Sequence, residues 1–171
     1  PSGSVSVNYG ASQKFTITVN TGYNISQVLV DGSAVTLAAD SSYTFTNVTA
    51  NHTISASFSL IPNYSLTISA THGSVTKKVS GVVTTATSFP AGTQVELTAV
   101  PSTGYSFSSW SGDASGTTNP VTITMNANKS VTANFAINVY TITASAGTGG
   151  SISPSGSVSV NYGASQKFTI T

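Results

Sequence analysis

The chain has 171 residues but no cysteine, no arginine and only nine charged side chains, five basic and four acidic. Without cysteine, disulfides and thiolate metal sites are excluded, and the redox compartment of the protein stays undetermined. Five scattered lysines are too few for the electrostatic footprint of a nucleic-acid-binding protein. No run approaches the ~18 apolar residues of a membrane helix, and no charged stretch followed by an apolar run marks a signal peptide in this segment. We therefore expect no nucleic-acid partner and no membrane insertion of this segment.

Hydroxyl side chains take the place of charges. The chain has 30 serines and 27 threonines, one third of all residues, and its formal net charge is only +1. The hydrophobic content of 39% is ordinary for a globular protein, so the chain is able to bury a core and is not expected to be disordered. The composition predicts a folded protein whose surface is hydrated mainly by hydroxyl and amide groups.

An internal repeat organises the sequence, and repeats of this kind determine the fold. Residues 1–18 read PSGSVSVNYGASQKFTIT, and residues 154–171 read the same 18 letters. A weaker repeat lies within the unit that this defines, because residues 50–58 (ANHTISASF) align with residues 127–135 (ANKSVTANF). The repeating unit is therefore a pair of related modules, which we call A and B.

The repeat predicts the boundaries of these modules. We expect residues 1–63 to be a module A that lacks its first strands, residues 64–139 to be a complete module B, and residues 140–171 to hold the opening strands of the next module A. Two interpretations of this pattern stay open. Either the chain is a window on a long covalent array, which we favour, or it is a discrete subunit whose matching ends exchange strands with neighbouring copies.

Apolar residues alternate with serine and threonine along much of the chain. Alternation at period two predicts half-buried β-strands, and Gly, Asn, Asp and Pro mark the turns between them. Asp31-Gly32 lies between two apolar runs and is a specific β-hairpin signal. No window combines helical spacing with helix caps. The sequence predicts an all-β, helix-poor fold of tandem small antiparallel β modules, each of about 76 residues.

The core of each module is expected to consist of the larger apolar residues on the alternating faces. A module of this size buries only ~60–65% of its unfolded surface, so neighbouring modules should stabilise one another. The predicted core residues are Phe15, Ile17, Tyr23, Phe45, Phe58, Leu66, Ile68, Val95, Leu97, Tyr105, Phe107, Trp110, Ile123 and Phe135.

Module B carries motifs that resemble a known family. Residues 104–113 read GYSFSSWSGD, residues 119–125 read NPVTITM and residues 128–135 read NKSVTANF, as in the divergent internalin B-repeat domain of bacterial and archaeal surface proteins. Module A keeps Gly22-Tyr23 but has VLVDG at residues 28–32 where the tryptophan motif would stand, which leaves its local geometry open.

The resemblance implies tandem modules in large secreted or cell-surface proteins, where they act as stalks, spacers or adhesin segments. The better-known internalin B-repeats are β-grasp-like, with a short helix packed on a sheet. Because the sequence shows no helix, we expect a helix-poor version that is β-grasp-like or β-sandwich-like.

Trp110 and Asp113 are the candidate ligand-facing residues. An exposed tryptophan ring can stack on a sugar and a carboxylate can bind its hydroxyls, but Trp110 capping the core and Asp113 closing a turn is the favoured interpretation. One carboxylate between Asp113 and Asn119 is too few for a tight calcium site. His52 and His72 stand alone in different modules, so we expect no metal site and no cofactor.

Candidate N-glycosylation sites occur where an Asn-x-Ser/Thr pattern falls on or near a turn. The five matches are Asn24, Asn47, Asn51, Asn63 and Asn128. Catalysis by paired carboxylates is not expected, because the four acidic residues are widely spread.

The leading hypothesis is a structural tandem-repeat segment of a long extracellular surface protein or filament, acting as a stalk, shaft or spacer. One alternative is an adhesin module that binds carbohydrate or another surface. A second alternative is the subunit of a fibre that assembles by strand exchange. The expected partners are neighbouring copies of the same repeat, and glycans in the adhesin alternative, at an extracellular or cell-surface location.

Overall fold

The computed structural model describes residues 3–171, and over these residues the chain forms 17 β-strands and no helix. It divides after Pro62 into two compact units, unit 1 up to Pro62 and unit 2 from Asn63 to Thr171. The strands of unit 1 are β1 (Gln13–Thr16), β2 (Tyr23–Val30), β3 (Ser33–Ala34), β4 (Ser42–Phe45) and β5 (Ile54–Leu60). The strands of unit 2 are β6 (Asn63–Ala70), β7 (Gly73–Val79), β8 (Val82–Thr84), β9 (Ser88–Pro90), β10 (Gln94–Pro101), β11 (Tyr105–Gly112), β12 (Val121–Thr124), β13 (Lys129–Ile137), β14 (Val139–Ala144), β15 (Ile152–Ser153), β16 (Gly156–Asn161) and β17 (Thr169–Ile170).

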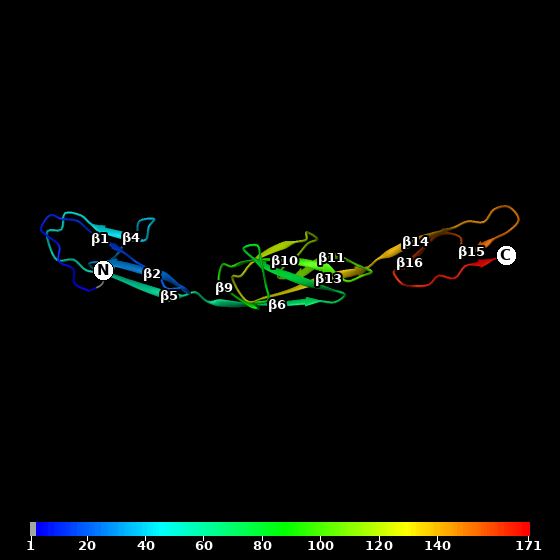
Figure 1. Ribbon diagram of the computed structural model, residues 1–171, viewed down its shortest axis with the longest axis horizontal. Coiled ribbons are helices and arrows are strands. Elements are labelled where there is room, and N and C mark those ends of the chain that lie inside the picture. Colours follow the sequence, from blue (N-terminus) through cyan, green and yellow to red (C-terminus); the bar gives the residue numbers. More distant parts are fainter. Residues whose placement is uncertain (1–2) are drawn as a thin grey trace. The chain divides into compact units, whose positions relative to one another are not determined.

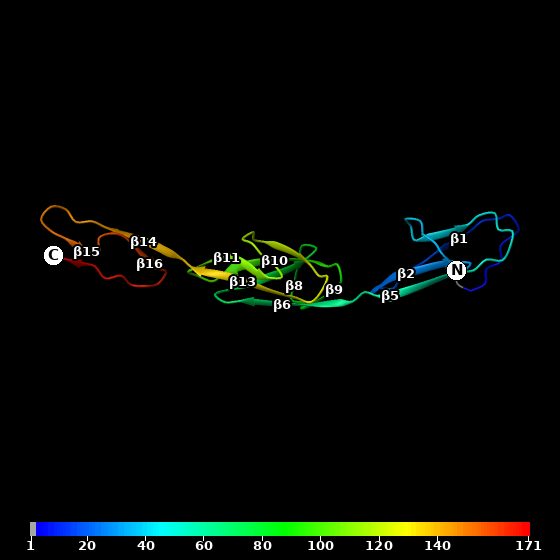
Figure 2. The same ribbon diagram turned by 180° about the vertical axis from the view of Figure 1, so that it is seen from behind.

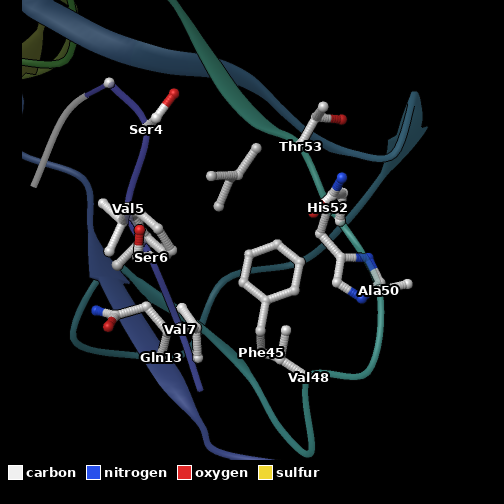
Figure 3. Close-up of a pocket in the computed structure, with 14 residues that line it drawn as sticks. Ser4, Val5, Ser6, Val7, Gln13, Phe45, Val48, Ala50, His52 and Thr53 are labelled. Atoms are coloured by element: carbon white, nitrogen blue, oxygen red, sulfur yellow. The ribbon is translucent and has the colours of Figure 1, made fainter. Parts of the chain in front are cut away.

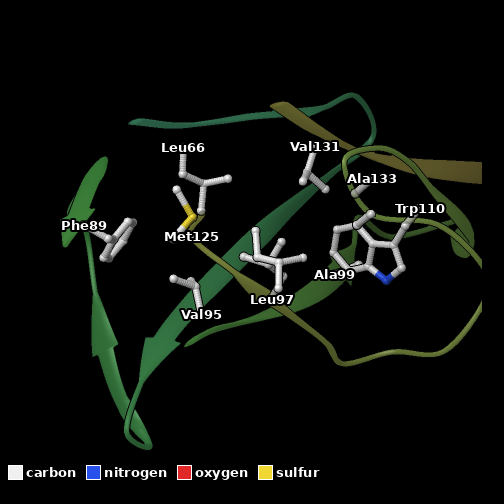
Figure 4. Close-up of a cluster of buried hydrophobic side chains, with 11 residues drawn as sticks. Leu66, Phe89, Val95, Leu97, Ala99, Trp110, Met125, Val131 and Ala133 are labelled. Atoms are coloured by element: carbon white, nitrogen blue, oxygen red, sulfur yellow. The ribbon is translucent and has the colours of Figure 1, made fainter. Parts of the chain in front are cut away.

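Strands β6 to β13 form module B as two four-stranded sheets, in the orders β11-β13-β6-β9 and β12-β10-β7-β8 (Figure 1). Side chains from both sheets meet in one buried cluster, so module B is sandwich-like (Figure 4). The members of the cluster are Leu66, Phe89, Val95, Leu97, Ala99, Trp110, Ala114, Ile123, Met125, Val131 and Ala133. The predicted all-β, helix-poor fold is confirmed.

Strand β10 shows how the alternating sequence produces this core. Val95, Leu97 and Ala99 are buried on one face of the strand, whereas Glu96 and Thr98 on the other face are half-exposed. Successive side chains of a strand point to opposite faces, so an apolar residue at every second position supplies one buried row. The same rule accounts for Val131 and Ala133 of β13.

One strand pair of module B is parallel, although the sequence led us to expect antiparallel pairs throughout. β13 pairs with β6 in parallel, with Lys129 opposite Leu66 and Ala133 opposite Ala70 (Figure 2). The first and the last strand of the module therefore lie side by side in one sheet. Hydrophobic alternation marks the buried face of a strand but not its direction, which explains the difference.

Unit 1 repeats part of this architecture with two smaller sheets, β3-β2-β5 and β1-β4. The predicted hairpin is present, because β2 and β3 are joined by Asp31 and Gly32, both with positive φ as a type I′ turn requires. The β2–β5 pair has a register shift between Ile25 and Gln27. The β11–β13 pair has the same irregularity at the matching position, between Phe107 and Ser109. Module A thus keeps the bulge of module B.

The core predicted for unit 1 is only partly present. Among the described residues of this unit, Val28, Val30 and Ser42 are the fully buried ones. The predicted core residues Phe15, Ile17 and Phe45 are half-buried. The prediction was wrong for Tyr23 and Phe58, each of which is 44% exposed.

In module B the same prediction holds better, because both sheets are complete. Leu66, Val95, Leu97, Trp110 and Ile123 are buried as expected. The remaining predicted residues, Ile68, Tyr105, Phe107 and Phe135, are half-buried. Burial of an alternating row depends on a second layer that covers it, and unit 1 has only part of that layer within the described chain.

The last part of unit 2 consists of two short ladders. β14 pairs antiparallel with β16, from Val139 opposite Asn161 to Ala144 opposite Gly156, and β15 pairs with β17 (Figure 1). Tyr162 packs on module B, since a Cβ atom placed on Gly104 would lie only 2.1 Å from the Cδ1 atom of Tyr162. Asn138 connects the same parts, because its N–H donates to the Gly104 carbonyl and its carbonyl accepts from the Tyr162 N–H.

Candidate functional site

The Trp110–Asp113 corner of module B lies where β11 ends. Trp110 is 3% exposed and its Nε1–H donates to the Thr118 carbonyl at 3.0 Å, so the ring belongs to the core. The Oδ2 atom of Asp113 accepts from the Ser130 N–H at 2.7 Å, and the Asp113 N–H donates to the Ser130 carbonyl at 2.8 Å. Asp113 thus fastens the end of β11 to the start of β13. Sugar stacking would need an exposed ring, and the ring of Trp110 is covered.

Module A builds the same corner from Asp31, which the sequence placed in a hairpin turn without identifying it as the counterpart of Asp113. Its Oδ1 atom accepts from the Thr53 N–H at 2.7 Å, and its N–H donates to the Thr53 carbonyl at 3.1 Å. His52 Nδ1 lies 2.7 Å from Oδ2. The Thr53 N–H first, and then the His52 side chain, lower the pKa of Asp31 below its usual value. Spacing along the chain identifies Asp31 as the counterpart of Asp113. Asp31 follows Val28 by three positions, and Asp113 follows Trp110 by three positions.

A second exposed carboxylate of unit 1 lies beside the buried Ser42. Asp40 receives a hydrogen bond from Lys14 Nζ at 2.6 Å and another from the Ser42 hydroxyl at 2.5 Å. These two donors, Lys14 more than Ser42, lower the pKa of Asp40 from 3.8 to about 2. Because Lys14 is on β1 and Asp40 precedes β4, the ion pair joins the two strands of the small sheet.

The five candidate glycosylation sites Asn24, Asn47, Asn51, Asn63 and Asn128 are all exposed. Asn128 differs from the others in that its Oδ1 atom accepts from the Ser65 N–H at 2.9 Å, which joins the turn before β13 to β6. Asn51 is the corresponding residue of module A. Exposure is what a glycosyltransferase requires of an acceptor asparagine, and glycosylation itself stays a prediction.

Metal-ligating residues are scattered over the part of the chain that the structure describes. Residues 3–171 bring together no three His, Cys, Asp or Glu side chains that could hold a metal ion. The two histidines contact aromatic rings, His52 against Phe45 at 5.2 Å and His72 against Tyr105 at 4.2 Å between ring centroids. Over the same described range, no helix of the length and hydropathy of a membrane span is present.

Unit 1 has a hollow of about 720 Å³ between the segment before β1, strands β1 and β4, and the residues that lead into β5 (Figure 3). Its apolar lining comes from the segment before β1, from β1 and β4, and from the start of β5. The apolar lining residues are Val5, Val7, Phe15, Phe45, Val48, Ala50 and Ile54, and Asn51 and His52 lie at the same cavity. No feature of the sequence predicted this hollow.

The comparisons with known proteins agree with the motifs of module B. The family model of the divergent InlB B-repeat domain matches the chain twice in succession, over residues 2–62 and residues 64–139. The chain therefore belongs to this family, which confirms the resemblance. The family is a repeat domain of surface proteins and not a known enzyme family. No curated protein and no solved structure is significantly similar to the chain.

Proposed function

We propose that this chain, as a member of the divergent InlB B-repeat family, is a load-bearing spacer segment of a long extracellular surface protein. Two consecutive family matches and the identical residues 1–18 and 154–171 support a role in which modules are added in series. In such a segment the function is length and resistance to extension, and no ligand is required.

The observation that carries the proposal is the parallel pairing of β6 and β13. The chain enters module B at Asn63, the first residue of β6, and leaves it at Ile137, the last residue of β13. Because these strands are neighbours and run in the same direction, entry and exit lie at opposite ends of the sheet. A force between them pulls the two strands past each other, so that all hydrogen bonds of the ladder share the load.

Single-molecule force measurements on the 171-residue chain test this role. Pulling module B from Asn63 to Ile137 should give one unfolding event that lengthens the chain by about 230 Å. This is the extended length at ~3.6 Å per residue minus the distance between the two residues in the folded module. A matched control pulls from Asn63 to Asn128, two residues at the same end of the paired strands, so that the ladder opens one bond at a time. We expect a clearly lower unfolding force in this second geometry. Equal forces in both geometries would contradict the load-bearing role.

The surface location has its own test. An antibody against residues 64–139 should label intact cells of the source organism, and external protease should remove the signal. Labelling that requires lysis of the cells would refute the location and leave the mechanical prediction standing. Binding of the chain to a glycan array would favour the adhesin alternative instead.

A further inference from the structure

The connection between module B and the module that follows it is a single residue. β13 ends at Ile137 and β14 begins at Val139, so Asn138 alone links them. Both backbone polar groups of Asn138 are used, because its N–H donates to the Gly104 carbonyl at 2.8 Å and its carbonyl accepts from the Tyr162 N–H, also at 2.8 Å. The peptide groups on either side of the linker residue are therefore held, one by module B and the other by the following module.

The ring of Tyr162 lies on Gly104, in the space that a side chain at this position would occupy. A Cβ atom on Gly104 would lie 2.1 Å from Cδ1 of Tyr162, 2.6 Å from Cε1 and 2.7 Å from Cγ. The glycine is required for a second reason, because its φ of 83° is a conformation that most other residues adopt only with strain. The ring can approach the backbone this closely because position 104 has no side chain.

The loop that carries Gly104 is itself held within module B. The Tyr105 N–H donates to the Ser102 carbonyl at 3.0 Å, and the Ser102 N–H donates to the His72 carbonyl, also at 3.0 Å. The rings of His72 and Tyr105 are stacked, with their centroids 4.2 Å apart and an angle of 3° between their planes. Tyr162 thus packs on a part of module B that two hydrogen bonds and a ring stack hold in place.

The cover on Tyr162 comes from module B and not from its own segment. Tyr9 is the same residue in the identical residues 1–18, and it is 85% exposed against 46% for Tyr162. In module B the matching residue is Ala91, because Ala91 precedes Gly104 by 13 positions (104 − 91) as Tyr9 precedes Gly22 (22 − 9), and a glycine follows each directly. A module of this kind therefore folds with only a methyl group at the position, and the tyrosine is not needed for the fold of its own module.

We propose that Tyr162 locks the joint between module B and the following module, so that the two keep one orientation to each other. Asn138 alone would leave two rotatable backbone angles between them, which is enough for a hinge. Its two hydrogen bonds restrain these angles, and the ring of Tyr162 braces the joint against Gly104. Bending toward the ring is blocked by its contact with the backbone, and bending away would expose the covered part of the ring to water.

The locked joint deepens the proposed spacer function, and its biological use rests on that function. A segment that supplies length must resist bending as well as extension, and a chain of folded modules bends at its linkers. The backbone bond is common to both modules, since the Ile61 N–H donates to the Gly22 carbonyl at 2.7 Å at the end of module A. The tyrosine is not common to both, because module B has Ala91 in its place. Stiffness at the end of module B therefore depends on one side chain.

The test is the distribution of distances between two spin labels, measured by electron paramagnetic resonance on the 171-residue chain, which has no cysteine of its own. Thr67→Cys on β6 and Ser157→Cys on β16, both at exposed positions, place one label on each side of Asn138. We expect one narrow distribution. Tyr162→Ala should make it roughly twofold broader, because the single-residue hinge is then free. Tyr162→Phe should keep it narrow, because ring carbons make the contact, and Tyr9→Ala is the matched control that should leave it unchanged.

Gly104→Asn tests the same contact from the side of module B. Asparagine tolerates positive φ better than most residues, but its Cβ atom would displace the ring, so this variant should broaden the distribution as Tyr162→Ala does. Fluorescence of Trp110, the single tryptophan, confirms that module B is folded in every sample. A broad distribution for the original chain, a narrow one for Tyr162→Ala or for folded Gly104→Asn, or broadening by Tyr162→Phe or Tyr9→Ala would each overturn the proposal. The force measurement pulls module B alone, so failure of the joint and failure of the load-bearing role are separate results.

Discussion

Truncation of Leu66 to alanine should destabilise module B strongly. The side chain is 2% exposed and lies in the cluster between the two sheets. Removing three carbons from such a site costs the transfer free energy of the lost atoms and the cavity that they leave, together about 3 kcal/mol. A domain of this size loses ~4–8 °C in Tm for each kcal/mol, so the unfolding midpoint of module B should fall by about 12–24 °C.

Tryptophan fluorescence reports this transition alone. Trp110 is the single tryptophan of the chain and is buried in the same cluster as Leu66, so its emission follows the unfolding of module B and not that of unit 1. Thermal scans at several heating rates would establish that the midpoint reflects an equilibrium.

Ile142→Ala is the matched control. It removes the same number of carbons from the aligned position of the next module, where the side chain is 41% exposed. We expect this variant to shift the fluorescence midpoint by less than about 4 °C, because partly exposed side chains contribute little to stability. A Leu66→Ala shift as small as that of Ile142→Ala would refute the account of the module B core.

Two further predictions concern single positions. Gly112→Ala should destabilise module B more than Gly116→Ala: both glycines have positive φ, which costs an alanine ~1–2 kcal/mol, but only at Gly112 would the new Cβ atom lie 2.3 Å from the Ser130 carbonyl oxygen. Equal losses of stability in denaturant titrations would contradict this reasoning. The pKa of Asp40 in the folded chain is about 2 against 3.8 for a free carboxyl, so its contribution to stability is complete above pH 3.8 and is lost as the pH falls through about 2. A carboxyl NMR titration should give that pKa, and Lys14→Gln should raise it toward 3.8; a native value already near 3.8 would show that the ion pair is absent in solution.

The fold of module B was largely predictable because its signals are local. The alternation in β10 marks the buried row, and Asp31-Gly32 marks a hairpin turn whose φ angles few other residues adopt without strain. The direction of β6 relative to β13 was not predictable. Apolar residues alternate with polar ones along a half-buried strand whether its neighbour is parallel or antiparallel. The pairing of the first with the last strand is a property of the whole module and has no local signal.

The failures in unit 1 have a different cause. Tyr23 and Phe58 have the alternating neighbours of core residues, and Phe58 aligns with the half-buried Phe135. Their counterparts in module B, Tyr105 and Phe135, pack against His72 and Gly73 where β7 begins, and residues 3–62 contain no equivalent of this segment. A sequence pattern shows which face of a strand is apolar. Whether that face is buried depends on a second layer that covers it, which the pattern of one strand does not show.

In the candidate site, too, features set by neighbours along the chain were predictable, and features set by strand pairing were not. The neighbours of Asp113 along the chain predicted a turn, but the partner of its side chain, the Ser130 N–H, depends on the register of β11 against β13. Asp31 was assigned to a hairpin turn and was not matched to Asp113, because the tryptophan motif was compared by residue type. Compared by position, Val28 takes the place of Trp110 in the core, and the aspartate that follows three residues later is the feature that both modules share.

The two copies of the 18-residue segment show how the surroundings of a segment affect its secondary structure, because the residues themselves are the same. Because residues 3–8 and residues 156–161 are identical, their different conformations cannot arise from propensity and must arise from the neighbouring strand. A module that cannot bury its rows alone gains stability when a neighbour provides the missing strand, as in other repeat proteins.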